Sequence, residues 1–222
     1  MRYNLITIFG GVLLVFWAIS GVVEAQLKIT KPLQQPPSPH VHSSAVLATA
    51  IFEDDESIGE WYMNSNSGTL ERRLTGGLPG GFLHMKGFKP YIIGMRTRRP
   101  EFTGKYLRPG AVSFDLKYKI QQITNYKVYV MLVNCSAIIG SNWIFELQIP
   151  GDYTWEHVSV LFDPSWTDQQ AIAAGWKRQT ESPPVSWAQT LYHLRWIGIY
   201  VETFSPTAYL CEIGTDNFLV QR

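Results

Sequence analysis

Within residues 111–119, apolar and polar side chains alternate without interruption from Val112 onward. Successive side chains of an extended chain point to opposite faces, so this period of two is typical of a strand with one buried face. One face carries Val112, Phe114, Leu116 and Tyr118, and the other carries Ser113, Asp115, Lys117 and Lys119. Sheets that bury one face and leave the other in water are antiparallel. The segment therefore predicts an antiparallel sheet that packs one face against a core.

Other segments of the chain extend this strand pattern. Glu156–Phe162 and Arg195–Glu202 also alternate, whereas Val128–Val133 is apolar on both faces, as expected of a central strand that is covered on each side. Turn-forming residues separate the further strands that we expect, which are Ala45–Phe52, Gly81–Phe88, Trp143–Ile149, Tyr209–Ile213 and Asn217–Gln221.

Helical patterns are confined to two short segments, Thr167–Gly175 and Ser186–Leu194. In the first of them, Thr167 can cap the free amide groups and Asp168 suits the positive end of the helix dipole. Gly175 can terminate this helix. The pattern as a whole predicts an all-β fold, an antiparallel β-sandwich (jelly roll) with one or two short helical insertions.

The N-terminal region has the organisation of a signal peptide. Met1-Arg2 precedes an apolar run from Leu5 to Val23, which ends in the small-residue sequence Val23-Glu24-Ala25. We expect residues 1–25 to be a secretory signal peptide that is cleaved before Gln26, and the mature protein to be secreted or periplasmic. The alternative is a retained membrane anchor, because the apolar run is almost long enough to cross a bilayer. Contact with a membrane is expected only in that case.

The rest of the chain divides into a linker and one domain. Residues 26–44 contain the proline-rich run Pro36-Pro37-Ser38-Pro39, and proline fits neither a helix interior nor the interior of a sheet. This stretch is expected to be an extended linker. Residues 45–222 have the length of a single domain and form the predicted β-sandwich.

Charge and motifs favour a binding protein over an enzyme. The formal net charge is +1, so the composition gives no reason to expect a nucleic-acid partner. The five histidines show no metal-binding spacing, and no Gly-x-Ser-x-Gly motif marks a nucleophile. The acidic run Glu53-Asp54-Asp55-Glu56 leaves a glycoside hydrolase as a third hypothesis, since that reaction uses two carboxyl groups.

Several short motifs resemble those of a known extracellular family. Phe52-Glu53, Trp61, residues 77–83 with the sequence GLPGGFL, and residues 101–116 with the sequence EFTGKYLRPGAVSFDL look like the laminin B-type (laminin IV) domain and related bacterial secreted jelly-roll proteins. The closing residues 214–218, GTDNF, are similar to the final strand of that family. The resemblance spans roughly residues 50 to 221, and it implies a non-enzymatic sandwich with a galactose-binding-like fold.

The tryptophans suggest which ligand such a domain binds. Sugar-binding modules place indole faces against the apolar C–H patches of pyranose rings, although large aromatic side chains are also common in sandwich cores. Trp143 shares a strand face with Phe145 and Leu147 and is assigned to the core. The predicted ligand-binding residues lie in loops or opposite a buried strand face, and they are Trp155, Trp166, Trp176 and Trp196. The preferred hypothesis is a secreted, non-catalytic carbohydrate-binding module, and the alternative is a structural or protein-interaction module that binds an extracellular protein.

Two features that would stabilise the fold are also predicted, a disulfide and a calcium site. Cys135 and Cys211 are the only cysteines and would meet an oxidising compartment, so they are expected to form a disulfide. Two buried thiols too far apart to join are an equally weighted alternative. The resemblance to carbohydrate-binding jelly rolls implies a structural calcium ion, and Glu53 and Asp216 are the acidic residues at the matching positions. Asp54 and Asp55 are alternative ligands, and the other alternative is an empty site in which Asp216 only caps a turn.

Overall fold

The computed structural model describes residues 46–54, 59–64, 67–121, 123, 125–134, 142–179, 185–204, 206–207 and 209–221. The predicted signal peptide, residues 1–25, and the predicted linker, residues 26–44, lie outside the described residues. No helix within the described ranges is both long enough and apolar enough to cross a membrane.

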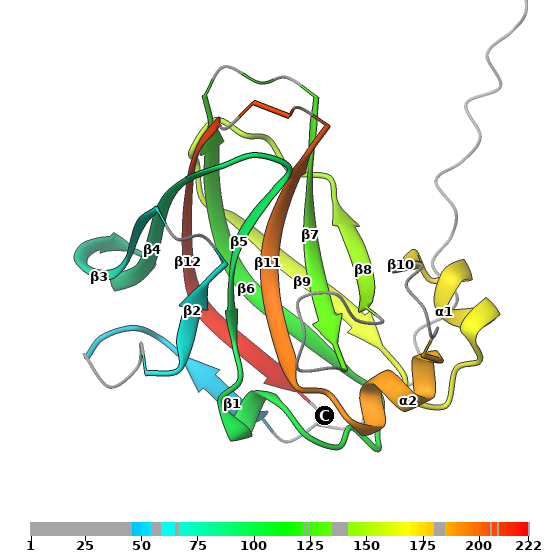
Figure 1. Cartoon of the computed structure of the whole chain (residues 1–222). Helices are drawn as coiled ribbons and strands as arrows, with labels where there is room; N and C mark the ends of the chain where they lie inside the picture. Colours follow the sequence, from blue (N-terminus) through cyan, green and yellow to red (C-terminus); the bar gives the residue numbers. More distant parts are fainter. Residues whose placement is uncertain are drawn as a thin grey trace, which may run out of the picture. The chain divides into compact units, whose positions relative to one another are not determined.

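Two antiparallel sheets face each other and form a β-sandwich (Figure 1). The first, sheet A, has the order β3-β4-β12-β6-β9, and β1 also pairs with β12. Its strands are β1 (Val46–Ala50), β3 (Gly68–Gly77), β4 (Gly80–Lys89), β6 (Gly110–Ile120), β9 (Glu156–Phe162) and β12 (Tyr209–Gln221).

The second, sheet B, has the order β10-β8-β7-β11-β5-β2. Its strands are β2 (Trp61–Met63), β5 (Ile92–Thr97), β7 (Tyr126–Val133), β8 (Asn142–Leu147), β10 (Trp176–Gln179) and β11 (Trp196–Thr203). A short 3-10 helix, η2 (Pro100–Phe102), lies between β5 and β6 in the chain. The all-β, jelly-roll sandwich predicted from the sequence is confirmed.

The core lies between the two sheets and is built from the faces that the alternation predicts. All four apolar residues of the 111–119 pattern are buried, and so are the three apolar residues that alternate along β11. The central strand β7 is covered on both faces, as expected: Val130 is completely buried on one face and Tyr129 is 4% exposed on the other. Burial of such side chains is the main favourable contribution to folding.

The two predicted helices are present, and the predicted cap Thr167 is confirmed. Helix α1 (Asp168–Ala173) is capped by Thr167, whose side chain accepts a hydrogen bond from Gln170 N in a complete capping box. Helix α2 (Trp187–Tyr192) is capped by Ser186 in the same way. Both helices lie at one end of the sandwich, close to β10 (Figure 1).

Three local differences separate the structure from the sequence prediction. The expected strands Tyr209–Ile213 and Asn217–Gln221 are one strand, β12, whose pairing with β6 shifts register between Asp216 and Leu219. The residues between the two segments, which resemble a turn in the sequence, form a β-bulge within the strand. Asn217 adopts a positive φ of 49° in this bulge. The strands β2, β3, β5 and β10 carry weak alternation and were not predicted. The predicted solvent-facing side of β6 is largely covered, since Ser113, Asp115 and Lys117 are each 9% exposed.

The structure does not support the predicted disulfide. Cys211 is completely buried and is a free cysteine, whereas Cys135 lies outside the described residues. In the register of β12 and β6, Cys211 lies opposite Ile120. The rings of Tyr118 and Tyr126 pack against each other at this end of the sandwich. The pairing of Cys135 with Cys211 therefore stays a prediction.

Candidate functional site

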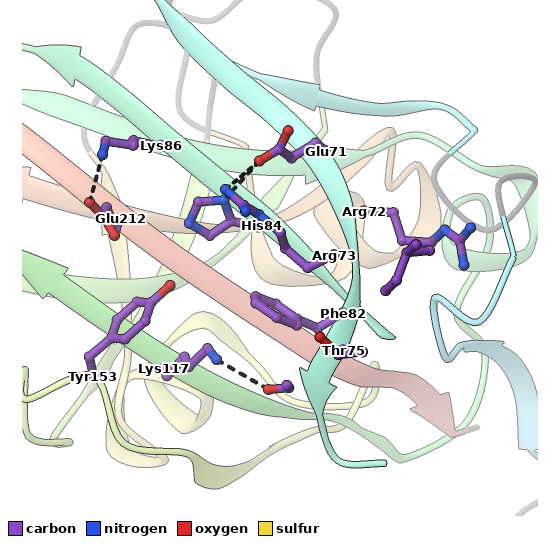
Figure 2. Close-up of a pocket in the computed structure, with 12 residues that line it drawn as sticks. Glu71, Arg72, Arg73, Thr75, Phe82, His84, Lys86, Lys117, Tyr153 and Glu212 are labelled. Atoms are coloured by element: carbon purple, nitrogen blue, oxygen red, sulfur yellow. Dashed lines mark hydrogen bonds and ion pairs between the residues drawn. The ribbon is translucent and has the colours of Figure 1, made fainter. Parts of the chain in front are cut away.

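An open groove lies on the outer face of sheet A and has a volume of about 670 Å³ (Figure 2). Strands β3, β4, β12 and β6 supply most of its lining, and Tyr153 in the loop before β9 supplies one side. The residues around it are Glu71, Arg72, Arg73, Leu74, Thr75, Gly76, Phe82, His84, Lys86, Lys117, Tyr153 and Glu212.

Strand register brings the groove residues onto one face. Glu71 lies opposite His84, His84 lies opposite Gly214, and Gly214 lies opposite Lys117. Side chains directly opposite each other in an antiparallel sheet point to the same face. A single row across four strands therefore carries an acid, an imidazole, a position without a side chain and an amine.

Gly214 lies buried on β12 between His84 and Lys117, beneath two side chains of the groove. A β-carbon at this position would approach Lys117 Cε to 2.9 Å and Phe82 Cε2 to 2.9 Å. The absence of a side chain here therefore lets Lys117 and Phe82 pack directly over β12.

Aromatic rings surround the amine at one end of the groove. Lys117 Nζ lies 4.0 Å from the ring centroid of Phe82, 4.2 Å from that of Trp155 and 5.0 Å from that of Tyr153. Phe82 and Trp155 pack edge to face, with their centroids 5.3 Å apart. A cation over an aromatic face is stabilised by the ring quadrupole, so the three rings hold this ammonium group in place.

A backbone oxygen near the end of β3 orients two side chains at the same end of the groove. Gly76 O accepts a hydrogen bond of 3.0 Å from Trp155 Nε1 and one of 3.2 Å from Lys117 Nζ. Trp155 is half-buried, so part of its indole ring faces solvent. Of the four tryptophans predicted to bind a ligand, Trp155 is thus placed beside a groove.

Ion pairs occupy the other end of the groove. Arg73 binds Glu71 Oε1 at 2.6 Å, and Lys86 binds Glu212 at 3.1 Å. His84 is 4% exposed, and its Nδ1 lies 3.5 Å from Glu71 Oε1 without forming a hydrogen bond. The two carboxylates of the lining are therefore each paired with a cation (Figure 2).

Burial changes the proton affinity of two groove residues. Burial lowers the pKa of His84 below its ordinary value of 6.5, and the charge of Arg73 lowers it further, although Glu71 partly opposes this. Burial also lowers the pKa of Lys117, against the opposing charge of Asp216. His84 is thus neutral at pH 7.

Trp176 is a core residue, contrary to its prediction as a ligand-binding residue. It is completely buried in β10, and its Nε1 donates to Leu161 O at 3.0 Å. Its ring centroid lies 5.0 Å from that of Trp187, which is also completely buried. The prediction was wrong because Trp176 follows α1 in a short strand that pairs with β8, so it does not lie in a loop.

Trp166 and Trp196 are half-buried and both lie away from the groove. Trp166 stacks on Trp187, with the centroids 6.0 Å apart, and packs against the core. Trp196 lies on the outer face of sheet B, where the guanidinium carbon of Arg96 is 4.3 Å from its ring centroid and the ring of Tyr62 is 5.5 Å away. The structure therefore does not bring the four predicted tryptophans together.

The predicted calcium ligands flank the turn between β3 and β4. Asp216 accepts hydrogen bonds from Leu78 N at 2.7 Å and from Asn217 N at 2.8 Å. Glu53 Oε1 accepts one from Gly81 N at 3.3 Å. The described residues contain no group of three His, Cys, Asp or Glu side chains that could hold a metal ion, so backbone oxygens would have to complete the site. The oxygen donors suit calcium, and the site stays a prediction.

Most residues of the groove were missed by the sequence prediction, although one signal was available. Phe82, His84 and Lys86 lie on the same face of the predicted strand Gly81–Phe88, opposite the buried Leu83 and Met85. An aromatic residue on the polar face of a strand is the signal that could have indicated this surface.

Comparisons with known proteins give matches among solved structures alone. No family model matches the sequence, and no curated protein matches it either. The structure is similar to the family 11 carbohydrate-binding module of the cellulase Lic26A-Cel5E of Clostridium thermocellum, with 14% identity over 79% of this chain and 95% of that chain and a TM-score of 0.48. It is also similar to the CBM22-1 xylan-binding domain of Paenibacillus barcinonensis Xyn10C, with 12% identity over 80% of this chain and 94% of that chain and a TM-score of 0.45.

A third similar structure contains an enzyme as well as a binding module. It is the CBM22-1–GH10 part of xylanase 10B of Clostridium thermocellum in complex with xylohexaose, with 10% identity over 81% of this chain and 29% of that chain and a TM-score of 0.49. At these identities and TM-scores, the matches do not decide what this chain binds. None of these three structures is a laminin B-type domain, so that resemblance stays a prediction.

Proposed function

We propose that the chain is a non-catalytic carbohydrate-binding module and that the groove on sheet A is its binding site. One observation carries this proposal: the half-buried ring of Tyr153 lines an open groove together with charged hydrogen-bonding side chains, and the half-buried ring of Trp155 packs beside the Lys117 ammonium group at its edge. Ligand sites typically combine aromatic surface with a few placed polar groups. A pyranose ring offers both an apolar C–H patch and hydroxyl groups, so it matches this lining.

The carboxylates of the groove favour binding without turnover. Glycoside hydrolysis uses two carboxyl groups that flank the scissile bond, one of which donates a proton. Glu71 and Glu212 are instead each held in an ion pair, with Arg73 at 2.6 Å and with Lys86 at 3.1 Å. The first pair lies along β3, and the second joins the neighbouring strands β4 and β12. We therefore assign these groups to ligand contact and not to acid–base chemistry.

The proposal is tested by two tryptophan variants of the exported protein. Affinity for a panel of soluble polysaccharides is measured by affinity electrophoresis and calorimetry, and folding is checked by circular dichroism. Loss of one aromatic contact costs on the order of 1–3 kcal/mol by analogy with base stacking, so Trp155→Ala should weaken binding about tenfold or more. Trp196→Ala is the matched control, because that half-buried indole lies on the other sheet.

The outcomes separate the possible sites. A parent protein that binds no polysaccharide of the panel would contradict the proposed function. Weaker binding in Trp196→Ala and unchanged binding in Trp155→Ala would move the site to the outer face of sheet B.

We further propose that the module acts after export, as the signal-like residues 1–25 predict. Intact-mass measurement of the exported protein should find Gln26 at the N-terminus. A mass that still includes residues 1–25 would instead indicate a membrane anchor.

A further inference from the structure

We propose that the groove selects an anionic polysaccharide, and that Lys117 and His84 contact the acidic group of the sugar. This inference rests on the proposed function, since it names the class of sugar that the same groove would bind. Three independent observations support it, and they concern the charge of the lining, an unsatisfied polar atom and the position of the ammonium group.

The first observation is the charge balance of the groove. Arg73, Lys86 and Lys117 share this face of sheet A with only two acids, Glu71 and Glu212, whereas Arg72 lies opposite the buried Leu83 and points away from the groove. Each acid is already in an ion pair, so the excess charge of the lining is positive. The whole chain has a formal net charge of only +1, so this excess belongs to the groove and is not a general property of the protein.

The second observation is an unsatisfied polar atom in the wall of the groove. His84 is 4% exposed, and its Nδ1 has no hydrogen-bond partner among the described residues. The nearest acid oxygen, Glu71 Oε1, lies 3.5 Å away and is bound by Arg73 at 2.6 Å. Buried polar atoms in proteins are normally hydrogen-bonded, so an atom without a partner in a ligand groove indicates a contact that the ligand supplies.

The third observation is the position of the Lys117 ammonium group. Its Nζ donates to Gly76 O at 3.2 Å and is surrounded by three rings, and no carboxylate forms an ion pair with it among the described residues. Burial lowers the pKa of Lys117, which shows that its charge is poorly solvated. An anion in the groove would stabilise this charge.

The arrangement also explains why a sugar would be selected over a free anion. The rings of Trp155 and Tyr153 lie beside the ammonium group, and Lys117 and Tyr153 both line the open groove. A sugar ring can therefore contact the aromatic side chains while its acidic substituent faces Lys117. A lysine interacts as a compact point charge, so the position of the acid matters more than its shape.

The test compares charged and neutral forms of the same polymer with the exported protein. Polygalacturonate is compared with its fully methyl-esterified form, and dextran sulfate with dextran. These two pairs distinguish a carboxylate from a sulfate as the acidic group. Binding is measured by calorimetry for the parent protein, for Lys117→Met and for Lys86→Met. Lys86→Met is the matched control, because it removes a charge from the same groove that is already paired with Glu212.

We expect the parent protein to prefer the charged form of at least one pair by about tenfold or more, which corresponds to about 1.4 kcal/mol. Lys117→Met should abolish this preference, and Lys86→Met should keep most of it. A second measurement needs no variant. Affinity of the parent for the charged polymer should fall as the pH rises into the range where Lys117 loses its proton, while affinity for a neutral polymer should not change.

Two results would overturn the inference, and they differ in what else they contradict. Equal affinity for charged and neutral polymers, with no pH dependence at alkaline pH, would overturn the selection of anionic sugars and leave carbohydrate binding intact. Absence of binding to every polymer would contradict both the inference and the proposed function.

Discussion

Trp155 Nε1 donates a hydrogen bond of 3.0 Å to the backbone oxygen of Gly76, a residue 79 positions earlier in the chain. Lys117 Nζ donates to the same oxygen at 3.2 Å. The carbonyl group of Gly76, near the end of β3, therefore holds the side chains of Trp155 and Lys117 next to each other. A binding residue whose orientation is fixed by such bonds loses less freedom when the ligand arrives.

The structure predicts that two tryptophan substitutions differ in their cost to folding. Trp176→Ala should lower the free energy of unfolding by roughly 3–5 kcal/mol, because it removes a completely buried ring from the core. Trp155→Ala should lower it by about 1–2 kcal/mol, because this half-buried ring loses one hydrogen bond and its contacts with Phe82 and Lys117. Urea denaturation of both variants checks this. Equal losses would show that Trp155 is also a core residue.

Stability should decrease as the pH falls below neutrality because of His84. Burial lowers the pKa of His84 in the folded state below 6.5, so the unfolded chain takes up the proton first as the pH falls. The contribution is fully present above about pH 6.5 and is lost as the pH falls toward the lowered pKa. The midpoint of urea unfolding should be lower at mildly acidic pH than at neutral pH, and this difference should be smaller for His84→Gln than for the parent protein.

Calcium should stabilise the turn between β3 and β4. Asp216 is completely buried, and burial first, then the charges of Asp115 and Glu53, raise the pKa of its carboxyl group. A divalent cation between Glu53 and Asp216 would offset this repulsion and should raise the melting temperature by several degrees. Glu53→Gln should lose the shift, and Asp54→Asn, a change of the adjacent exposed acid, should retain it. Superimposable melting curves with calcium and with chelator would contradict the prediction.

Cys211 should be a free but inaccessible thiol. It is completely buried, and burial raises the pKa of its thiol. In a Cys135→Ser variant, a thiol reagent should find no reactive group in the folded protein and one after unfolding. The parent protein, unfolded without reductant, should show two thiols. If none appears in the parent, the disulfide predicted from the sequence has formed after all.

The sequence predicts the core of this fold well because the core depends on local alternation. The strand β9 was predicted with its exact limits, Glu156–Phe162, and the caps Thr167 and Ser186 locate both helices. The strand β3 was missed because its sequence, GTLERRLTGG, is largely exposed at the edge of sheet A and has no apolar face to show a period. The strand conformation of such an edge segment depends on its pairing with the neighbouring strand, and its own sequence shows no apolar–polar alternation.

The site was harder to predict than the fold, because it depends on register between distant strands. Glu71, His84 and Lys117 meet only because β3, β4, β12 and β6 pair as they do. The loop position of Trp155 indicated its exposure correctly, but the same argument failed for Trp176, which lies in a short strand. The order of apolar and polar residues does not reveal which segments between the predicted strands pack against the core.

The strand β12 pairs with β1, β4 and β6, although it comes last among the described strands. Sheet A therefore cannot assemble progressively while the chain is being synthesised. Until Tyr209–Gln221 has left the ribosome, the edges of β4 and β6 that it covers stay open to other chains, and such edges promote aggregation. A nascent chain with this order of pairing has to be kept from self-association until its last strand arrives, and its folding is expected to be slow because the contacts that complete the sheet are distant in sequence.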